Sequence, residues 1–216
     1  ILGITGLLGS GRTELALALF GMNTPDSGEV WLDGKPFHPK SAKAALRAGL
    51  GYVPENRLVQ GLVMQQSVGR NVVVTIIRRL LGKIGLIDPD EYQRRVKQWI
   101  SELNIRVPSP ESAVETLSGG NQQRVVVAKW LATSPKVLIL DGPTVGIDVA
   151  AKGAIHQIIR LLAEQGLGVI VISDEVEEVH GTCNRVLWMH RGRVKQEFLP
   201  ASSGSDEIQE AISQAG

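Results

Sequence analysis

The sequence has little cysteine, no long apolar run and no excess of charge of one sign. Cys183 is the only cysteine, which excludes a disulfide framework and a cysteine-ligated zinc site and fits a reducing compartment. No apolar run reaches the roughly 18 residues of a membrane-spanning helix, so we expect no direct membrane insertion. The 23 basic and 22 acidic side chains give a net charge of +1, which argues against nucleic acid as a partner.

What the sequence has in surplus is glycine, which makes up 24 of its 216 residues. That is about 11%, against a usual value of about 7%. Four of these glycines fall within the first eleven residues, directly around an apolar stretch that begins at Ile1. Because no starting methionine or polar segment precedes this stretch, we expect the chain to be a fragment of a longer polypeptide.

Short apolar strands alternate with helices over much of the chain, which predicts an α/β fold with a mostly parallel sheet. The middle of the chain has little strand pattern, and Asp88-Pro89-Asp90-Glu91 is a typical helix start. We therefore expect a helical subdomain inserted into a core of the P-loop type. The expected boundaries are 1–60 and 117–200 for the core, 61–116 for the helical subdomain and 201–216 for a loosely attached, helical C-terminal tail.

A glycine-rich turn follows the first expected strand and matches the P-loop pattern, except that Arg12 replaces lysine. Backbone amides can converge on phosphate oxygens there only where side chains are absent, and the following helix directs its positive end at the anion. An ordinary strand-turn-helix corner is the alternative interpretation. The residues expected at the nucleotide are Gly6, Gly9, Ser10, Gly11, Arg12, Thr13 and Glu14.

Two further motifs follow in order: Leu117-Ser-Gly-Gly-Asn-Gln-Gln123, and an apolar strand that ends in Asp141. Together with the P-loop they resemble the nucleotide-binding domain of ABC ATPases, and the resemblance covers about residues 1–200. The block Gly51-Tyr-Val-Pro-Glu-Asn-Arg57 is similar to the sugar-uptake branch, of the ribose, xylose or galactose type. Within that branch the chain is most similar to the second, C-terminal ATP-binding domain.

The resemblance implies ATP and Mg²⁺ as cofactors, with Thr13, Asp141 and Glu55 near the metal. It also implies a head-to-tail pairing with the first ATP-binding domain of the same polypeptide, in which Asp148 is a dimer contact. Ser118 has a second interpretation as a helix cap, and capping of the next helix explains Asp148 equally well. The signature residues would complete the partner's site. These residues are Leu117, Ser118, Gly119, Gly120, Asn121 and Gln122.

The family resemblance further implies membrane permease subunits as partners, contacted near residues 58–71. It places the protein peripherally at the cytoplasmic face of the cell membrane. It also implies antiparallel strands before the P-loop strand, which would carry the aromatic residue that stacks on adenine and which this chain lacks.

Three departures from the family pattern coincide at the chain's own ATP site. Gly142 stands where the family has the glutamate that polarises water, and Asp174 stands where it has a histidine. Arg12 is larger and more planar than the usual lysine. Losing a general base costs about 10² to 10⁴ in rate, so we expect this site to bind ATP but hydrolyse it poorly. Asp174 has a second interpretation, as the cap of the helix that begins near Val176.

Two other functions remain open at this stage. One is a soluble ABC ATPase that acts on the ribosome or DNA, against which the near-neutral charge and the sugar-branch residues argue. The other is a P-loop kinase without a dimer, against which the signature motif argues. None of the four histidines shows the spacing of metal ligands, and we expect them to be structural or solvated.

Overall fold

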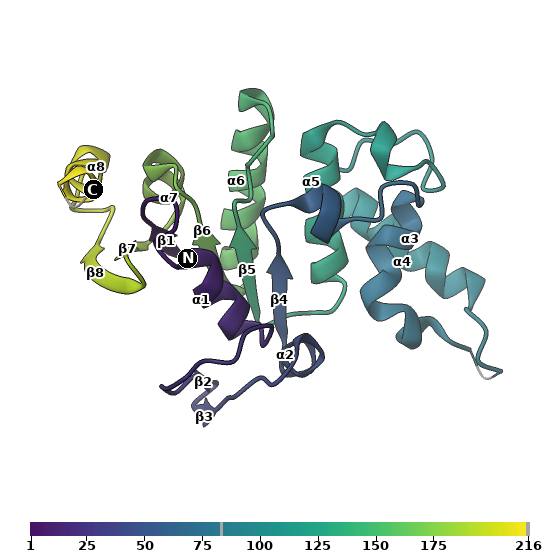
Figure 1. The fold of residues 1–216 in the computed structure, drawn as a ribbon. Coiled ribbons are helices and arrows are strands. Elements are labelled where there is room, and N and C mark those ends of the chain that lie inside the picture. The colour runs from purple at the N-terminus through teal and green to yellow at the C-terminus, as the bar shows by residue number, and fades with distance from the viewer. Residues whose placement is uncertain (83, 215–216) are drawn as a thin grey trace. The chain divides into compact units, whose positions relative to one another are not determined.

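The computed structural model describes residues 1–82 and 84–214, and these group into two compact units (Figure 1). The first unit comprises residues 1–52, 136–143 and 159–216. The second comprises residues 53–135 and 144–158, and so includes the expected helical segment 61–116. Within the described ranges, no helix has the length and apolar character needed to cross a membrane.

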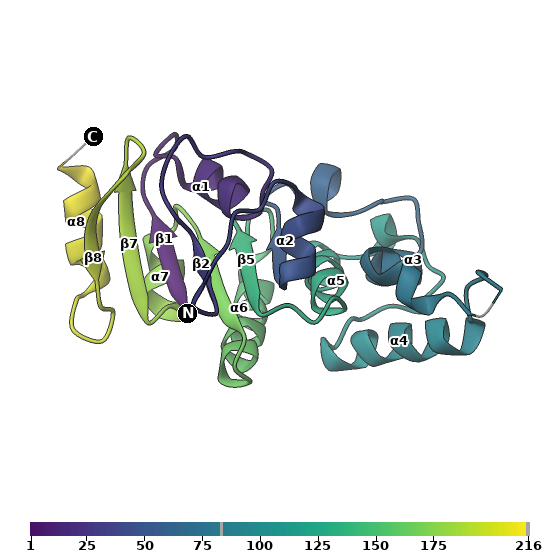
Figure 2. The same ribbon diagram turned by 90° about the horizontal axis from the view of Figure 1, so that it is seen from below.

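A six-stranded sheet organises the first unit, in the strand order β4-β5-β6-β1-β7-β8 (Figure 1; Figure 2 shows the sheet from below). Strands β1, β5, β6 and β7 are parallel, and β8 runs antiparallel to β7, which confirms the predicted α/β fold. The register pairs both Ile4 of β1 and Asp141 of β5 with Ile172 of β6. The loops that follow these three strands therefore leave the same edge of the sheet. The strands are β1 (Leu2–Thr5), β4 (Leu50–Val53), β5 (Val137–Asp141), β6 (Gly168–Ile172), β7 (Arg185–His190) and β8 (Arg193–Phe198).

Helices and a small hairpin complete this unit. Helix α7 packs so closely on β1 that a Cβ added to Gly3 would lie 3.0 Å from the Cys183 sulfur. The C-terminal helix α8 packs on α7 and buries Ile208 and Ile212, so the expectation of a loosely attached tail was wrong. Its apolar residues four apart face α7 despite the polar composition. The elements are α1 (Arg12–Leu19), β2 (Trp31–Leu32), β3 (Lys35–Pro36), α2 (Ala42–Ala48), α7 (Val176–Thr182) and α8 (Ser205–Ser213).

The second unit is helical and has its own apolar core. Helix α3 packs against both α4 and α5, and valines of all three are fully buried: Val68, Val72, Val96, Val125 and Val126. The helices are α3 (Val68–Val73), α4 (Pro89–Glu102) and α5 (Gly119–Leu131). A π-helical segment (Arg57–Gly61) and two 3₁₀ segments (Val74–Leu80 and Val114–Thr116) connect them. Helix α6 (Val149–Glu164) has its first ten residues in this unit and the rest in the first.

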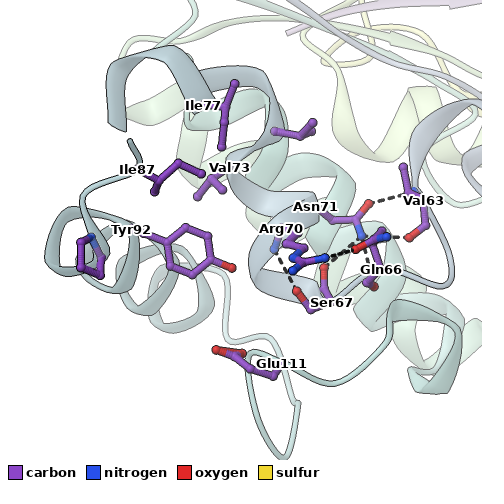
Figure 3. Close-up of a pocket in the computed structure, with 12 residues that line it drawn as sticks. Val63, Gln66, Ser67, Arg70, Asn71, Val73, Ile77, Ile87, Tyr92 and Glu111 are labelled. Atoms are coloured by element: carbon purple, nitrogen blue, oxygen red, sulfur yellow. Dashed lines mark hydrogen bonds between the residues drawn. The ribbon is translucent and has the colours of Figure 1, made fainter. Parts of the chain in front are cut away.

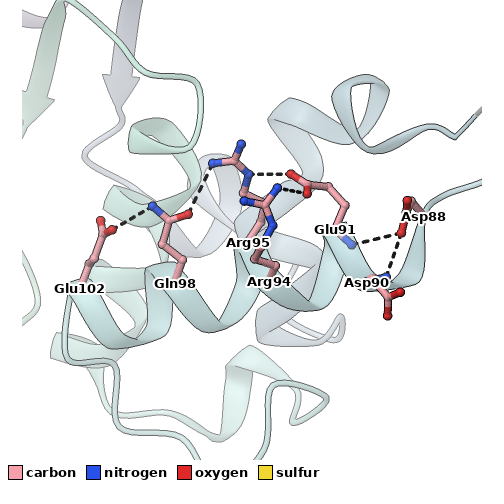
Figure 4. A network of polar contacts seen from close by, with 7 residues as sticks. All are labelled: Asp88, Asp90, Glu91, Arg94, Arg95, Gln98 and Glu102. Atoms are coloured by element: carbon pink, nitrogen blue, oxygen red, sulfur yellow. Dashed lines mark hydrogen bonds and ion pairs between the residues drawn. The ribbon is translucent and has the colours of Figure 1, made fainter.

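Helix α4 begins as its sequence predicts (Figure 4). The Asp88 side chain accepts hydrogen bonds from the backbone N–H groups of Asp90 and Glu91, with Pro89 at the first helical position. One turn on, Arg94 and Arg95 donate to Glu91, and these hydrogen bonds lower the pKa of its carboxyl group. The basic pair therefore has a partner on its own helix, at spacings typical of surface ion pairs.

Candidate functional site

The glycine-rich turn of the first unit needs glycine for packing as well as for close approach. Gly6, Gly9 and Gly11 all have positive φ angles, of 152°, 78° and 97°. A Cβ on Gly6 would lie 2.2 Å from the Met189 carbonyl oxygen, and one on Gly11 would lie 3.1 Å from the Cα of Gly192. A Cβ on Gly9 would meet open space. The turn thus rests on the β7–β8 hairpin, and Gly9 alone is free of that contact.

Helix α1 starts directly after this turn with its first amide groups available. Gly11 occupies the N-cap position in the left-handed conformation, and no side chain of the described residues caps the helix. Arg12 Nη1 and Ser10 Oγ are buried and have no hydrogen-bond partner among the described residues. Buried donors without acceptors are costly, and phosphate oxygens would satisfy them. Of the other predicted residues, Thr13 is half-buried and Glu14 is exposed.

The loops after β5 and β6 bring Gly142 and Asp174 to the same sheet edge as this turn. Asp141 is buried at the end of β5 and accepts a hydrogen bond of 3.1 Å from the Tyr52 hydroxyl. Gly142 has a φ of 56°, and its N–H donates to the Ile172 carbonyl. No side chain at position 142 can act as a base, and a larger residue there would be strained.

The alternative role of Asp174 as a helix cap was wrong. The N-cap residue of α7 is Glu175, and neither it nor Asp174 gives a side-chain cap hydrogen bond. Instead, Ser173 Oγ accepts the Glu175 N–H at 3.1 Å. A helix that starts one residue later than the pattern suggests leaves Asp174 exposed beside the sheet edge.

A magnesium ion fits this unit through few protein ligands. Thr13 supplies a hydroxyl at the first turn of α1 and Asp141 a carboxylate at the end of β5, both hard oxygen ligands. Across residues 1–82 and 84–214, no three His, Cys, Asp or Glu side chains gather as a metal site. Nucleotide oxygens would have to complete the coordination, as Mg²⁺ sites usually require. Glu55 belongs to the second unit and is exposed.

The second candidate site surrounds the start of α5. Ser118 is its N-cap residue, but its side chain makes no cap hydrogen bond. Its Oγ accepts 3.0 Å from Asn121 Nδ2, while Asn121 Oδ1 accepts 2.8 Å from the Arg106 backbone N–H. This chain of contacts fixes the orientation of the amide. Because Ser118 is the acceptor in this hydrogen bond, the bond does not use its hydroxyl proton, which can be donated to a ligand.

Both signature glycines are required by packing. A Cβ on Gly119 would lie 2.9 Å from Arg57 Nη2 and 3.2 Å from the Gly146 carbonyl oxygen. A Cβ on Gly120 would lie 2.9 Å from the Ala151 methyl group. The backbone of α5 therefore starts in direct contact with the loop before α6 and with α6 itself.

The remaining signature residues, Leu117 and Gln122, have structural positions. Leu117 is buried, and Gln122 Nε2 donates 3.0 Å to the Leu117 carbonyl. This hydrogen bond gives Gln122 a structural role that needs no ligand. A contact of Gln122 with a partner domain stays a prediction.

Asp148 lies beside Ser118 in a hollow of about 300 Å³. Its Oδ1 accepts the Ala151 N–H at 2.9 Å, so it does cap α6 as the alternative interpretation held. Arg106 and Arg124 line the same hollow, and Arg124 donates to the Leu103 and Asn104 carbonyls. Burial, together with the charge of Arg106, lowers the pKa of Arg124. The hollow thus combines a helix N-terminus and two arginines, which suit an anion, with the carboxylate of Asp148.

A larger groove of about 700 Å³ opens on the same unit (Figure 3). It is lined by α3, the start of α4 and the preceding loop, with apolar Val73, Ile77 and Ile87 near the Tyr92 ring and Val63 at the opposite end. Asn71 holds its wall by accepting the Val63 N–H at 2.8 Å and donating to the Val63 carbonyl at 3.0 Å. The groove includes part of the segment 58–71 that the sequence singled out.

With both sites described, comparison with known families identifies the fold. A model of the ABC transporter family matches residues 1–145. The chain belongs to this family. Its α/β P-loop architecture is also that of solved ABC ATPases. One is CbiO1 of Clostridium perfringens, part of the ABC transporter complex CbiONQ, with a TM-score of 0.75, 26% identity and coverage of 99% of this chain and 82% of that chain.

A second solved relative shares the fold at lower identity. It is the ATP-binding cassette MJ0796 in a dimeric post-hydrolysis state with ADP and phosphate, with a TM-score of 0.77, 22% identity and coverage of 93% of this chain and 85% of that one.

Curated relatives of this ABC domain are ribose import ATP-binding proteins. RbsA 2 of Streptomyces avermitilis is 45% identical over 96% of this chain and 41% of its own length. RbsA of Bacillus subtilis is 42% identical over 96% of this chain and 42% of its own length. The chain therefore spans about two-fifths of the length of the relatives it matches.

Sequence reasoning missed several residues on which these sites depend. Met189 and Gly192 support the P-loop turn, Arg106 orients Asn121, and Arg57 lies against Gly119. The hairpin around Gly192 and the block ending in Arg57 were both visible in the sequence. Their contacts with residues far along the chain were not.

Proposed function

We propose that the chain is the ATP-binding, energy-coupling domain of a bacterial import ABC transporter for a sugar such as ribose. The observation that carries this proposal is the presence of two ABC motifs in one chain. The P-loop turn has a buried Arg12 donor without an acceptor, and the signature has Ser118 held by a hydrogen bond from Asn121. The names of the ribose import relatives support the sugar. Sugar selection would belong to other subunits.

At the P-loop turn, we propose that the nucleotide phosphates lie over Gly9 and the first turn of α1. Arg12 and the first-turn amides would bind them, and Thr13 and Asp141 would hold Mg²⁺, which neutralises phosphate charge when bound. Glu55 is a further candidate metal ligand, and Ser10 and Glu14 are further candidate nucleotide-binding residues. ATP supplies the γ-phosphate for hydrolysis, but Gly142 gives no general base and exposed Asp174 adds negative charge.

The signature would serve a different nucleotide, bound to the first ATP-binding domain of the same polypeptide. The Ser118 hydroxyl and the amides at the start of α5 would donate to that γ-phosphate, and Asp148 would contact the partner. The relatives have more than half their length outside the region matched here, which leaves room for such a domain.

The permease is the proposed partner for the groove over α3 and α4. Its apolar lining and the Tyr92 ring fit the apolar face of a short helix, a common mode of peptide recognition. The domain would then lie peripherally at the cytoplasmic face of the cell membrane.

The first test measures nucleotide binding and hydrolysis by the purified chain. We expect ATP to bind weakly and to be recovered unhydrolysed, because binding donors are present and the base is absent. Arg12→Ala should weaken binding at least about tenfold, since a hydrogen bond to a charged group contributes about 1.5–3 kcal/mol. Hydrolysis at the rate of a complete ABC pair would refute the proposal of an impaired site.

A second test separates the transporter from an ABC ATPase that acts on the ribosome or DNA. Affinity purification of the complete polypeptide from detergent extracts should recover a membrane permease. Recovery of ribosomes or nucleic acid in its place would favour the other function.

A further inference from the structure

Arg57 is a buried charge on a surface loop and has no role in the function proposed above. It begins the π-helical segment Arg57–Gly61, and its own exposure is only 8%, whereas Glu55 and Asn56 before it are exposed. Burial of an ionised group is costly unless polar groups compensate it. The contacts of Arg57 therefore show which polar groups compensate its burial.

The guanidinium group of Arg57 binds the backbone of a distant loop. Nη1 donates 2.6 Å to the Val145 carbonyl, and Nη2 donates 2.9 Å to the Gly146 carbonyl. A planar guanidinium can bind two consecutive carbonyls at once, which a lysine ammonium cannot do with the same geometry. Burial lowers the pKa of Arg57, but an arginine remains charged in proteins.

The same guanidinium group lies against the signature. The position that a Gly119 Cβ would take is 2.9 Å from Arg57 Nη2, so the arginine fills the space beside this glycine. Gly119 directly follows Ser118, and Gly146 lies two residues before Asp148. Arg57 thus contacts the two backbone segments that carry the polar residues of the signature hollow.

The segment that begins with Arg57 is attached to α5 at its other end. Lys129 Nζ, from the last turn of α5, donates a hydrogen bond to the Gly61 carbonyl. Between these attachments Leu58 and Val59 expose 49% and 77% of their surfaces. A contact with these apolar side chains would act on a segment that is bound to the loop before α6 at one end and to α5 at the other.

We propose that Arg57 is a positioning residue that sets Ser118 and Asp148 in the arrangement the partner's ATP site requires, and that links this arrangement to the segment 57–61. The inference rests on the proposed function, in which the signature completes the site of the first ATP-binding domain.

The experiment measures steady-state ATP hydrolysis by the complete polypeptide that carries this chain. Arg57→Ala should lower kcat about ten- to hundredfold, because small displacements of a positioned group have effects of this size. The KM for ATP should change by less than about threefold, because the partner's own P-loop provides most of the binding. Arg57→Lys should restore only part of kcat. Arg78→Ala, at an exposed arginine of the same unit, is the matched control and should match the wild type.

A double-mutant cycle with Gly119→Ala tests whether Arg57 acts through the signature. The added methyl group should lower kcat in the wild-type background and have a clearly smaller effect when Arg57 is alanine, since the shortest contact is then gone and the Gly146 carbonyl oxygen, 3.2 Å away, remains. Thermal unfolding shows whether Arg57→Ala is folded. If it is not, the cycle is run with Arg57→Lys, whose ammonium group is smaller than the guanidinium.

Ser118→Arg is measured in parallel so that the two possible failures can be told apart. An active Ser118→Arg variant would refute the proposed function itself. If Ser118→Arg is inactive, wild-type kcat in Arg57→Ala or strictly additive effects in the cycle would overturn the role of Arg57 alone. A loss expressed mainly as a raised KM would also overturn it.

Discussion

The two candidate sites of this chain differ in what their polar groups contact. In the P-loop turn, Arg12 Nη1 and Ser10 Oγ are buried without partners in the described part of the protein. In the signature, Asn121 is bonded on both sides and holds Ser118. The polar groups of the P-loop turn lack acceptors that a phosphate could supply, and Gly142 provides no base. The polar groups of the signature are already hydrogen-bonded to one another. Under the proposed function, the signature would keep the geometry on which a partner domain depends, and chemistry would be lost only at the chain's own P-loop site.

The largest predicted effect on ATP hydrolysis comes from a substitution in the signature. Ser118→Arg in the complete polypeptide should reduce ATP hydrolysis by at least about a hundredfold, because it removes a donor to the γ-phosphate and fills the hollow beside Asp148. Asp174→Asn is the control at the chain's own site and should change the rate by less than about twofold, because no base acts there. Steady-state phosphate release measures both, and equal losses in the two variants would refute the asymmetry.

A pair of glycine substitutions tests the P-loop turn. Gly6→Ala should destabilise the chain by about 3 kcal/mol or more, because its Cβ would lie 2.2 Å from a backbone carbonyl oxygen. Gly9→Ala meets open space and should cost only about 1 kcal/mol, from its positive φ. Urea unfolding of the two variants measures the difference. Equal losses of stability would mean that the contact with the β7–β8 hairpin does not matter.

A buried lysine gives the second unit a pH dependence of stability. Burial lowers the pKa of Lys129 to about 8 from 10.5, with its ammonium 5.3 Å from the centre of the Trp130 ring. Between these pH values the unfolded chain binds more protons, so this lysine's contribution makes the free energy of unfolding rise with pH. The stability difference between wild type and Lys129→Met should therefore shift in favour of the wild type from pH 8 to 10.5. A difference that is constant with pH would show that Lys129 is not buried as described.

The last prediction concerns the thiol beneath the P-loop strand and requires no substitution. Burial raises the pKa of Cys183 to about 12, and its sulfur lies against Gly3. Alkylation at pH 8 should be at least about a hundredfold slower than in the urea-unfolded chain, because the thiolate is the reactive form. Equal alkylation rates in the folded and unfolded chain would indicate that α7 leaves the strand.

Local sequence patterns predicted most of the fold. The apolar strands and the Asp88 cap follow from residue types within a few positions of one another. The cap of α7 was misplaced because Asp174 is a preferred capping residue, whereas the helix starts after Glu175, which gives no side-chain cap hydrogen bond.

The contacts that shape the two sites depend on residues far apart in the sequence. Arg57 bonds to carbonyls 88 and 89 residues away, and the Gly6 contact with Met189 joins opposite ends of the chain. A motif can indicate that Gly6 or Gly119 must be small for a phosphate. It contains no information on the backbone or side chain that already occupies the neighbouring space.

The most direct test of the account is a single-turnover experiment on the complete polypeptide loaded with radiolabelled ATP. The account predicts that the nucleotide on the first ATP-binding domain is converted to ADP, while the nucleotide on this chain's P-loop remains ATP over the same interval. Site-specific crosslinking before nucleotide analysis assigns each fraction. Conversion of both nucleotides to ADP in one phase would contradict the account.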